Sequence, residues 1–336
     1  MLKYYVDVNL DLILCDKKNN YYLYKINKMK KISIIIPFYN EKENLPIILS
    51  KVKTLIDNEA TYKFEILLMD NDSIDGSDLI ANELMKNFDD IKYFKMSRNF
   101  GYQANIKAGY DYCLGDAAVQ LDADGEDDPE IISKFIIEWE NGNDVVYGIR
   151  EKREESFLLS FFRNIFYKFL NKFSDVNLPI GAGDFRLIDR KVIDSLIKLD
   201  EKNLYLRGLI SYIGFQQKGI TYNRNKRFSG TSKISLIKYF EISITAITSF
   251  TKTPLLIIFL IGLALSSISL ILLIMYLFIF LFSDIPQPGF TTLVLLQLSF
   301  FGLIILLIGI VLIYVGYILD EVKKRPTYII DVKNKK

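Results

Sequence analysis

The sequence predicts an α/β protein in which a mostly parallel sheet domain is followed by interfacial helices and a hairpin of two transmembrane helices. Two observations support this prediction. Short apolar runs with β-strand character alternate with helical patterns over residues 32–147, and such alternation is typical of βα units around a parallel sheet. Residues 255–319 then hold one charged side chain, Asp284, in 65 residues, which indicates a separate membrane part.

The composition excludes several classes of function. With 42 basic and 40 acidic side chains, the net charge of +2 argues against a nucleic-acid partner. The chain has no histidine, which excludes a histidine general base, a Ser-His-Asp or Cys-His nucleophile and every histidine-ligated metal site. Cys15 and Cys113 form no Cys-x-x-Cys pair, so they predict neither a zinc site nor a disulfide framework and favour a reducing, cytosolic location.

Five segments follow from the distribution of charged and apolar residues. They are an N-terminal extension (residues 1–28), a soluble domain (29–232), a juxtamembrane amphipathic helix (233–252), two transmembrane helices within 253–320, and a cytoplasmic tail (321–336). Charged side chains interrupt residues 1–28, so we expect no signal peptide there.

The soluble domain contains five predicted strands, at residues 32–36, 64–69, 91–96, 117–121 and 144–147. Polar residues follow three of them, beginning at Pro37, Asp70 and Asp122. Ligands of parallel α/β sheets bind at the carboxyl ends of the strands. We therefore expect these three strand ends to converge on one binding crevice.

Two segments are candidates for helices in the membrane interface. Residues 156–173 place apolar side chains at helical spacing with basic residues among them, which fits an interfacial helix or, equally, a helix packed on the sheet. Residues 234–250 directly precede the membrane part.

Residues 255–282 and 290–319 contain 28 and 30 residues without a charge, and about 20 suffice to span the hydrocarbon core. Lysines precede the first span and follow the second, while the linker 283–289 has no basic residue. The positive-inside rule then places the soluble domain and both termini in the cytoplasm, with the chain crossing the cell membrane more than once.

A stripe of small residues, Gly302, Gly309 and Gly316, lies on one face of the second span. Small residues permit close helix contact, so we expect a homo-oligomer. Ordinary transmembrane glycine usage is the alternative explanation.

The strongest chemical signal is the Asp122-Ala123-Asp124 sequence directly after an apolar strand. Residues 122–130 contain six acidic side chains in nine positions, which repel one another unless a cation or solvent relieves them. Oxygen ligands of this kind suit Mg²⁺ or Mn²⁺ carried with a diphosphate. A solvated Asp-x-Asp turn is the alternative.

Six motifs occur along the chain in a fixed order. They are residues 34–41 (IIIPFYNE), 65–77 (EILLMDNDSIDGS), 98–101 (RNFG), 121–130 (LDADGEDDPE), 183–187 (GDFRL) and 206–208 (LRG). In this order they resemble the motifs of inverting family 2 glycosyltransferases. More narrowly, residues 30–328 resemble the dolichyl-phosphate-mannose-synthase-like polyisoprenyl-phosphate glycosyltransferases, which include bacterial polyprenyl-phosphate glucosyltransferases with two C-terminal transmembrane helices.

The resemblance implies a GT-A Rossmann-like fold and transfer of one sugar from a nucleotide-diphosphate sugar, such as UDP-glucose or GDP-mannose, to a polyprenyl phosphate. The residues that it assigns to the nucleotide sugar are Pro37, Tyr39, Asn40, Glu41, Asp70, Asn71, Arg98, Asp122 and Ala123. The metal ligands would be Asp124, Asp122 and Glu126, where Glu126 replaces a frequent Gln. The family pattern Asp-Asp-Gly-Ser reads Asp70-Asn71-Asp72-Ser73 here, which leaves the identity of the base open.

The resemblance assigns catalysis to Asp184, as candidate general base, together with Arg207. Because a phosphate monoester is already nucleophilic, Asp184 would serve largely to orient the reactants. Structural pairing of Asp184 with Arg186 is the alternative. The two phosphates would be bound by Arg207, Arg227, Ser232 and Lys233, although residues 227–233 could equally be a basic linker facing anionic lipid headgroups.

Two other functions compete with this one. A processive polysaccharide synthase would carry a Gln-x-x-Arg-Trp helix, whereas the only tryptophan, Trp139, lies between two glutamates. A non-catalytic membrane adaptor with a decayed transferase domain would fit Asn71 and Asp72, but not the retained Asp122, Asp124, Asp184 and Arg207.

Overall fold

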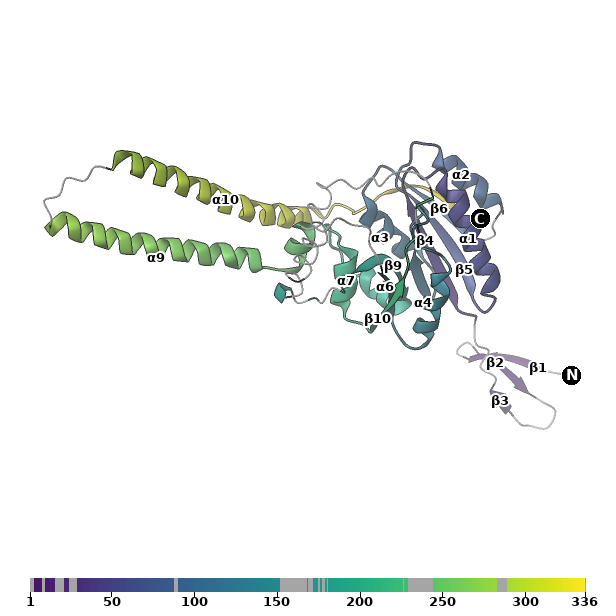
Figure 1. Ribbon diagram of the computed structural model, residues 1–336. Coiled ribbons are helices and arrows are strands. Elements are labelled where there is room, and N and C mark those ends of the chain that lie inside the picture. Colours follow the sequence, from purple (N-terminus) through teal and green to yellow (C-terminus); the bar gives the residue numbers. More distant parts are fainter. Residues whose placement is uncertain are drawn as a thin grey trace.

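The protein consists of an α/β domain, a small N-terminal sheet, and a pair of long helices that extends away from the α/β domain (Figure 1). The computed structural model describes residues 3–7, 10–15, 21–23, 29–87, 90–151, 168, 172–174, 176, 179, 181–225, 227–228, 244–282 and 289–335. The small sheet is antiparallel and consists of β1 (Lys3–Asp7), β2 (Leu10–Cys15) and β3 (Tyr21–Leu23).

The α/β domain is built on an eight-stranded sheet of order β10-β8-β9-β7-β4-β5-β6-β11. Its strands are β4 (Lys31–Phe38), β5 (Lys63–Asp70), β6 (Ile91–Met96), β7 (Ala117–Gln120), β8 (Val145–Arg150), β9 (Ala182–Asp189), β10 (Gln217–Tyr222) and β11 (Ile330–Lys335). Strands β7, β4, β5 and β6 are parallel, as are β10 and β8, whereas β9 and β11 are antiparallel to their neighbours. The mostly parallel α/β fold is therefore confirmed, and all five predicted strands are present.

Helices cover both faces of the sheet. They are α1 (Asn44–Asn58), α2 (Ser77–Leu84), the 3₁₀ turn η1 (Met85–Asn87), α3 (Tyr102–Tyr112), α4 (Ile131–Glu140), α6 (Arg190–Ile197) and α7 (Leu206–Ile213). Strand β4 shows the arrangement, because Ile34 packs in one core with α1 and α4, while Ile35 packs in another with α3, α6 and α7. A strand covered on both faces is apolar at consecutive positions, which explains its unbroken isoleucine run.

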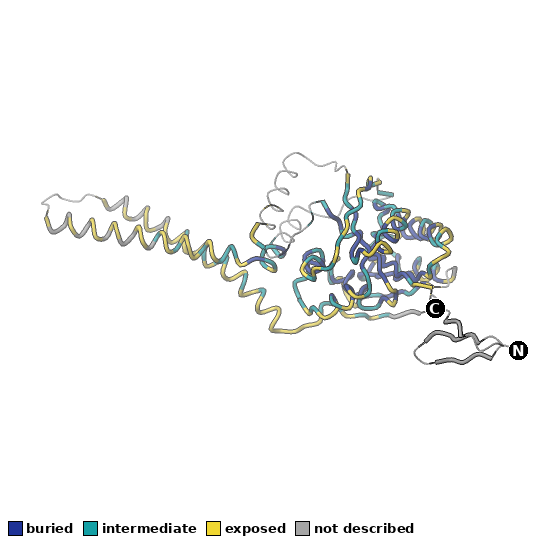
Figure 2. Tube along the Cα trace, turned by 90° about the horizontal axis from the view of Figure 1, so that it is seen from below, coloured by how far each residue is buried: buried dark blue, intermediate teal, exposed yellow. Residues whose placement is uncertain are grey.

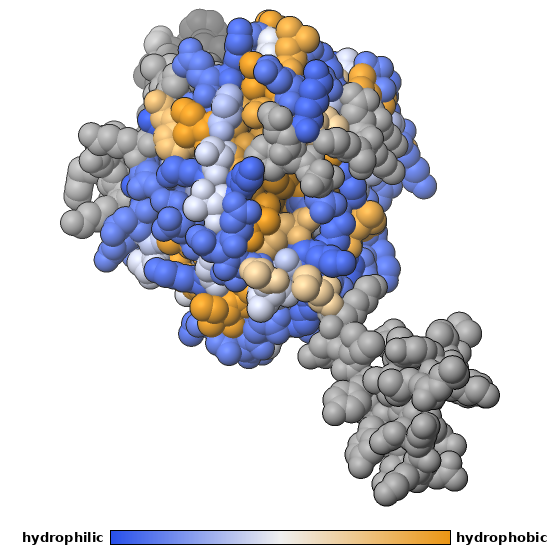
Figure 3. All heavy atoms as spheres, turned by 90° about the vertical axis from the view of Figure 1, so that its right-hand side faces the viewer, coloured by the Kyte–Doolittle hydropathy of each residue, from blue (hydrophilic) through white to orange (hydrophobic). Residues whose placement is uncertain are grey.

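The two long helices are α9 (Thr253–Phe282) and α10 (Phe290–Lys323). Their 30 and 34 residues correspond to lengths of about 45 and 51 Å. Figure 2 shows exposed residues along both helices, and large apolar side chains such as Phe259 and Ile305 are among them. In contrast, the face of the α/β domain turned away from them is mostly hydrophilic (Figure 3).

Within the described residues, Phe300–Lys323 is long and apolar enough to cross a membrane. A second candidate is the pair Ile244–Phe250 and Thr253–Leu265, whose two helical parts meet at 83°. The structure thus offers one span, or two if the bent pair counts, so the predicted two-helix hairpin stays a prediction. Its linker, like most of residues 156–173, lies outside the described residues.

The glycines on which the prediction of a homo-oligomer is based lie along α10. A Cβ atom placed at Gly302, Gly309 or Gly316 would meet no atom within 4 Å, apart from the helix's own backbone. The face is open, and oligomerisation also stays a prediction.

The C-terminal segment returns from α10 to the far edge of the sheet, which the sequence did not predict. Strand β11 pairs with β6, and the Tyr328 hydroxyl donates to Asp111 Oδ2 at 2.7 Å. The segment predicted as a tail therefore contributes an edge strand to the α/β domain.

A buried carboxylate, Glu65 on β5, joins three parts of the sheet. Its Oε1 accepts hydrogen bonds of 2.6 Å from the Ser33 hydroxyl and from the Leu114 N–H. Its Oε2 lies 3.0 Å from Lys31 Nζ and 2.6 Å from Lys92 Nζ. Burial alone raises the pKa of Glu65, but these donors outweigh it and hold the pKa at about 2.

We expect Glu65 to make stability depend on pH. Its folded-state pKa lies below the ordinary value of 4.5, so its contribution is complete above about pH 4.5 and is lost as the pH falls toward 2. Glu65→Gln should lower the free energy of unfolding by about 2 kcal/mol at pH 7, because hydrogen bonds to a charge are lost. It should also flatten the stability profile between those pH values, measured by urea unfolding.

The matched control is Glu140→Gln, because Glu140 pairs with Lys30 at 2.8 Å on the exposed surface. That substitution should cost less than about 1 kcal/mol. Equal losses of unfolding free energy in the two variants would show that the buried bonds of Glu65 contribute no more than a surface ion pair.

Candidate active site

The three predicted strand ends meet at one edge of the sheet. The Asn40 N–H donates to Ser73 Oγ at 2.9 Å, and the Asn40 Oδ1 accepts from the Ile74 N–H at 2.9 Å. These bonds join the loop after β4 to the loop after β5. The predicted convergence is confirmed, because β7 pairs with β4 and delivers Asp122 to the same edge.

The departure from the family's Asp-Asp-Gly-Ser pattern has a conformational explanation. Asp72 stands where the pattern has glycine, and its φ is +65°. Glycine adopts this left-handed region freely, and aspartate is among the few other residues that enter it routinely. The loop therefore keeps its backbone shape without the glycine.

Two residues assigned to the nucleotide sugar are buried in this loop scaffold. Asp70 is fully buried and accepts hydrogen bonds of 2.8 Å from the Ser73 N–H and the Tyr93 hydroxyl, and burial raises its pKa. Asn71 is 4% exposed, donates to Asn99 Oδ1 at 3.0 Å and accepts from the Phe100 N–H at 3.0 Å. Both side chains hold neighbouring loops together.

The other residues assigned to the nucleotide sugar stand around this edge. Pro37 and Ala123 are buried, and Tyr39 is half-buried. The Arg98 guanidinium stacks on the Phe100 ring at 4.0 Å from its centroid. Glu41 Oε1 accepts from Arg227 Nη2 at 2.7 Å, so a residue assigned to the donor contacts one assigned to the acceptor.

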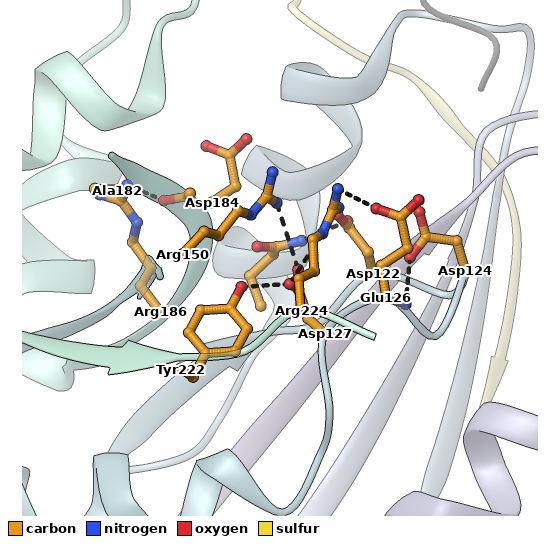
Figure 4. A network of polar contacts seen from close by, with 12 residues as sticks. Asp122, Asp124, Glu126, Asp127, Arg150, Ala182, Asp184, Arg186, Tyr222 and Arg224 are labelled. Atoms are coloured by element: carbon orange, nitrogen blue, oxygen red, sulfur yellow. Dashed lines mark hydrogen bonds and ion pairs between the residues drawn. The ribbon is translucent and has the colours of Figure 1, made fainter. Parts of the chain in front are cut away.

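Asp122 and Asp124 lie at the centre of the edge (Figure 4). Asp122 Oδ1 accepts from the Tyr102 hydroxyl at 2.6 Å and from Gln120 Nε2 at 2.8 Å. Burial, followed by the charges of Asp124 and Asp127, raises the pKa of Asp122 to about 7. This crowding of negative charge is the electrostatic condition that a bound cation relieves.

Two further acidic side chains of the loop, those of Glu126 and Asp127, are held by cations. Figure 4 shows Glu126 paired with Arg224, and the Tyr222 hydroxyl bonded to Asp127. Asp127 also lies 3.4 Å from Arg224 Nε and 3.7 Å from an Arg150 nitrogen. Glu126 is thus paired with Arg224, and its role as a third metal ligand stays a prediction.

Among the residues that the structure describes, no group of three acidic or cysteine side chains is arranged to hold a metal ion. Asp122 and Asp124 still fit Mg²⁺ or Mn²⁺, because such ions are commonly bound by one or two carboxylates together with substrate phosphates. The donor set that fits best is these two residues plus a diphosphate.

The predicted catalytic pair is formed. Arg207, in the first turn of α7, holds Asp184 of β9 through two bonds, Nε–Oδ1 at 2.7 Å and Nη2–Oδ2 at 2.6 Å. Burial raises the pKa of Asp184, but Arg207 outweighs it and leaves the pKa below the ordinary value. The predicted alternative partner Arg186 instead donates to the Gly183 carbonyl at 2.7 Å.

Sequence reasoning missed four residues at this edge: Tyr102, Arg150, Tyr222 and Arg224. Tyr102 directly follows the Arg98–Gly101 motif, and Arg224 lies three residues before Arg227, so their positions in the chain were available signals. The predicted phosphate ligands Ser232 and Lys233 lie outside the described residues.

Comparisons with known proteins show the family to which the chain belongs. Residues 33–197 match the family model described as "Glycosyl transferase family 2". The chain is 37% identical over 299 residues to the "Uncharacterized glycosyltransferase YkcC" of Bacillus subtilis, which covers 89% of this chain and 92% of that protein. The chain therefore belongs to glycosyl transferase family 2 and is a glycosyltransferase, and the predicted GT-A fold is confirmed.

The chain is also similar to two further proteins. The "SfII prophage-derived bactoprenol glucosyl transferase" of Shigella flexneri is 33% identical over 301 residues, covering 89% of this chain and 97% of that protein. Among solved structures, S. aureus TarS 1-349 in complex with UDP-GlcNAc aligns with a TM-score of 0.41 and 15% identity, covering 64% of this chain and 66% of that one.

Proposed function

We propose that the protein transfers one sugar from a nucleotide-diphosphate sugar to a polyprenyl phosphate at the cytoplasmic face of the cell membrane. The observation that carries the proposal is the pairing of two differently charged sites at one sheet edge. Asp122 and Asp124 form an acidic site, and Arg207 lies on the neighbouring Asp184. Relatives named bactoprenol glucosyl transferases, aligned over nearly their full length, support a lipid acceptor.

On the donor side, we assign the acidic pair Asp122 and Asp124 to the metal-bound diphosphate. Mg²⁺ or Mn²⁺ bound there would neutralise the diphosphate and stabilise it as a leaving group. Tyr102 holds the Asp122 carboxylate by a 2.6 Å hydrogen bond, which orients it toward the ion. UDP-glucose is the first donor to test and GDP-mannose the second.

On the acceptor side, Arg207 is suited to bind the lipid phosphate because its guanidinium forms bidentate contacts with phosphate oxygens. A phosphate oxygen attacks the anomeric carbon as the bond to the diphosphate oxygen breaks, and the bonding electrons leave with the nucleotide. This single displacement inverts the anomeric configuration. The lowered pKa of Asp184 makes it a weak base, so we assign to Asp184 the orientation of Arg207.

The competing functions have less support. The adaptor hypothesis requires a decayed site, whereas Asp122, Asp184 and Arg207 form defined contacts. The synthase hypothesis requires tryptophan at an acceptor helix, whereas Trp139 in α4 donates to Asp189 Oδ2 at 2.7 Å and faces the opposite end of the sheet.

The proposed location is the cell membrane, with α9 and α10 both spanning it and both chain ends in the cytoplasm. The apolar surfaces of both helices and the lysines at their soluble ends support this arrangement.

The proposed function is tested by incubating purified protein with polyprenyl phosphate, a panel of labelled nucleotide sugars and Mn²⁺ or Mg²⁺. We expect a lipid-linked sugar that mild acid releases, and no product in excess EDTA. Asp124→Asn should reduce turnover by about a hundredfold or more, because charge stabilisation of the leaving group is lost. Full activity in EDTA, or in Asp124→Asn, would refute the metal assignment.

Asp184→Asn tests the acceptor side. The variant should lower kcat by about a hundredfold, because an amide has one uncharged acceptor oxygen and can no longer hold both Arg207 nitrogens in place. The Kd for the donor, measured by calorimetry with Mn²⁺, should stay within about twofold of wild type. If donor binding falls together with kcat, Asp184 belongs to the donor pocket.

The topology is tested with a cysteine introduced at Gln287, in a variant where Cys15 and Cys113 are replaced by serine. We expect an impermeant thiol reagent to label it in intact cells, and a cysteine at Lys335 to be labelled only after lysis. The reverse pattern would place the α/β domain outside the cell.

A further inference from the structure

The segment Ile244–Phe250 together with α9 and α10, called the membrane-side helices below, contacts the α/β domain beside Arg207. Phe250, at the end of the helical segment Ile244–Phe250, lies against the backbone of Gly208. A Cβ at position 208 would lie 2.4 and 2.5 Å from Phe250 ring atoms and 2.7 Å from a Tyr205 ring carbon. The Tyr205 and Phe250 rings meet edge to face, with centroids 6.1 Å apart. Only glycine leaves room for this ring.

The segment that carries Phe250 is bonded to α10. It belongs to an elbow, residues 244–253, in which the helical direction turns by 83° before α9 continues. The Tyr314 hydroxyl donates to the Thr251 carbonyl at 3.2 Å, and the Tyr317 hydroxyl lies 3.1 Å from Thr245 Oγ1. Both tyrosines belong to α10, so the elbow moves with the pair of long helices.

The segment that receives Phe250 also leads into the active site. Arg207 holds both Asp184 oxygens, and the neighbouring Leu206 N–H donates to Gln103 Oε1 at 3.1 Å. The adjacent Tyr102 binds Asp122. A shift of the first turn of α7 would therefore displace Arg207 directly. It would also disturb the start of α3, through the bond between Leu206 and Gln103.

A second contact joins the same segment to the C-terminal end of α10. The Lys202 N–H donates to Glu321 Oε1 at 2.8 Å. The segment 202–208 is thus held at both ends by the membrane-side helices, at Glu321 and at Phe250.

We propose that Phe250 is a positioning residue for sugar transfer. Its ring packs on Gly208 and fixes the first turn of α7. Arg207 thereby stays paired with Asp184 and keeps its position relative to the membrane-side helices. This inference rests on the proposed acceptor role of Arg207. The contact affects the acceptor side of the site and leaves the donor side at Asp122 and Asp124 in place.

The test compares Gly208→Ala, Phe250→Ala and the double variant, all in the full chain reconstituted in lipid vesicles. Gly208→Ala forces the ring away, so kcat with polyprenyl phosphate should fall by about ten- to a hundredfold, the usual cost of a misplaced group. The donor Kd with Mn²⁺ should stay within about twofold of wild type. The double variant removes the clash with Phe250 and leaves the one with Tyr205, so kcat should recover in part, from the level of Gly208→Ala toward that of Phe250→Ala alone.

Matched controls separate this effect from general changes at glycine or phenylalanine. Gly262→Ala lies on α9 where an added Cβ meets nothing within 4 Å beyond the helix's own backbone, and Phe259 is 62% exposed. Gly262→Ala and Phe259→Ala should leave kcat unchanged. Phe250→Leu, which keeps an apolar side chain, should retain more activity than Phe250→Ala and serves if Gly208→Ala does not fold.

Three outcomes would overturn the inference: unchanged kcat in both Gly208→Ala and Phe250→Ala, a parallel loss of donor affinity, or no recovery in the double variant. Failure of the proposed function looks different, because the wild-type protein itself would then make no lipid-linked sugar. In that case the inference is overturned together with the acceptor role of Arg207 on which it rests.

Discussion

The balance of charge at the carboxyl edge of the sheet is the interaction on which the rest of the structure depends. Residues 122–130 bring six carboxylates together after β7, and carboxylates this close destabilise one another unless cations lie among them. The cations come from β8 and from the segment after β10: Arg150 and Arg224. The acidic loop therefore requires the β8-β9-β10 half of the sheet to be in place, and that half also carries Asp184.

The seam between the α/β domain and the long helices follows from the same layout. Strand β9 is antiparallel, so it begins at the carboxyl edge and places Asp184 there. Its partner Arg207 comes from α7, which follows α6 along the chain. The first turn of α7 meets Phe250, and Lys202, just before that turn, bonds to Glu321. The proposed acceptor side of the site is consequently the side nearest the long helices, whereas Asp122 is held by Gln120 of β7 and Tyr102 of α3.

The sequence revealed the parallel strands and the paired Asp184 and Arg207, but not the antiparallel strands or the partners of the loop carboxylates. Parallel strands buried on both faces are unbroken apolar runs, as in β4, and are easily recognised. Strand β9 mixes Asp184 and Arg186 with apolar residues, and β11 is hydrophilic, so neither shows such a run. Nothing local in the sequence indicates that Arg224, about a hundred positions later, reaches Glu126.

The absence of histidine determines what kind of catalysis this site can perform. Arg207 holds the pKa of Asp184 below its ordinary value, and the carboxylate whose pKa is raised to about 7, Asp122, lies beside Asp124 at the proposed metal site. A sugar hydroxyl would need a base to become a nucleophile, whereas a phosphate monoester is anionic at neutral pH and needs a positive site that aligns it. The paired Arg207 and Asp184 are therefore suited to the phosphate acceptor that we propose, because they offer a fixed guanidinium rather than a base.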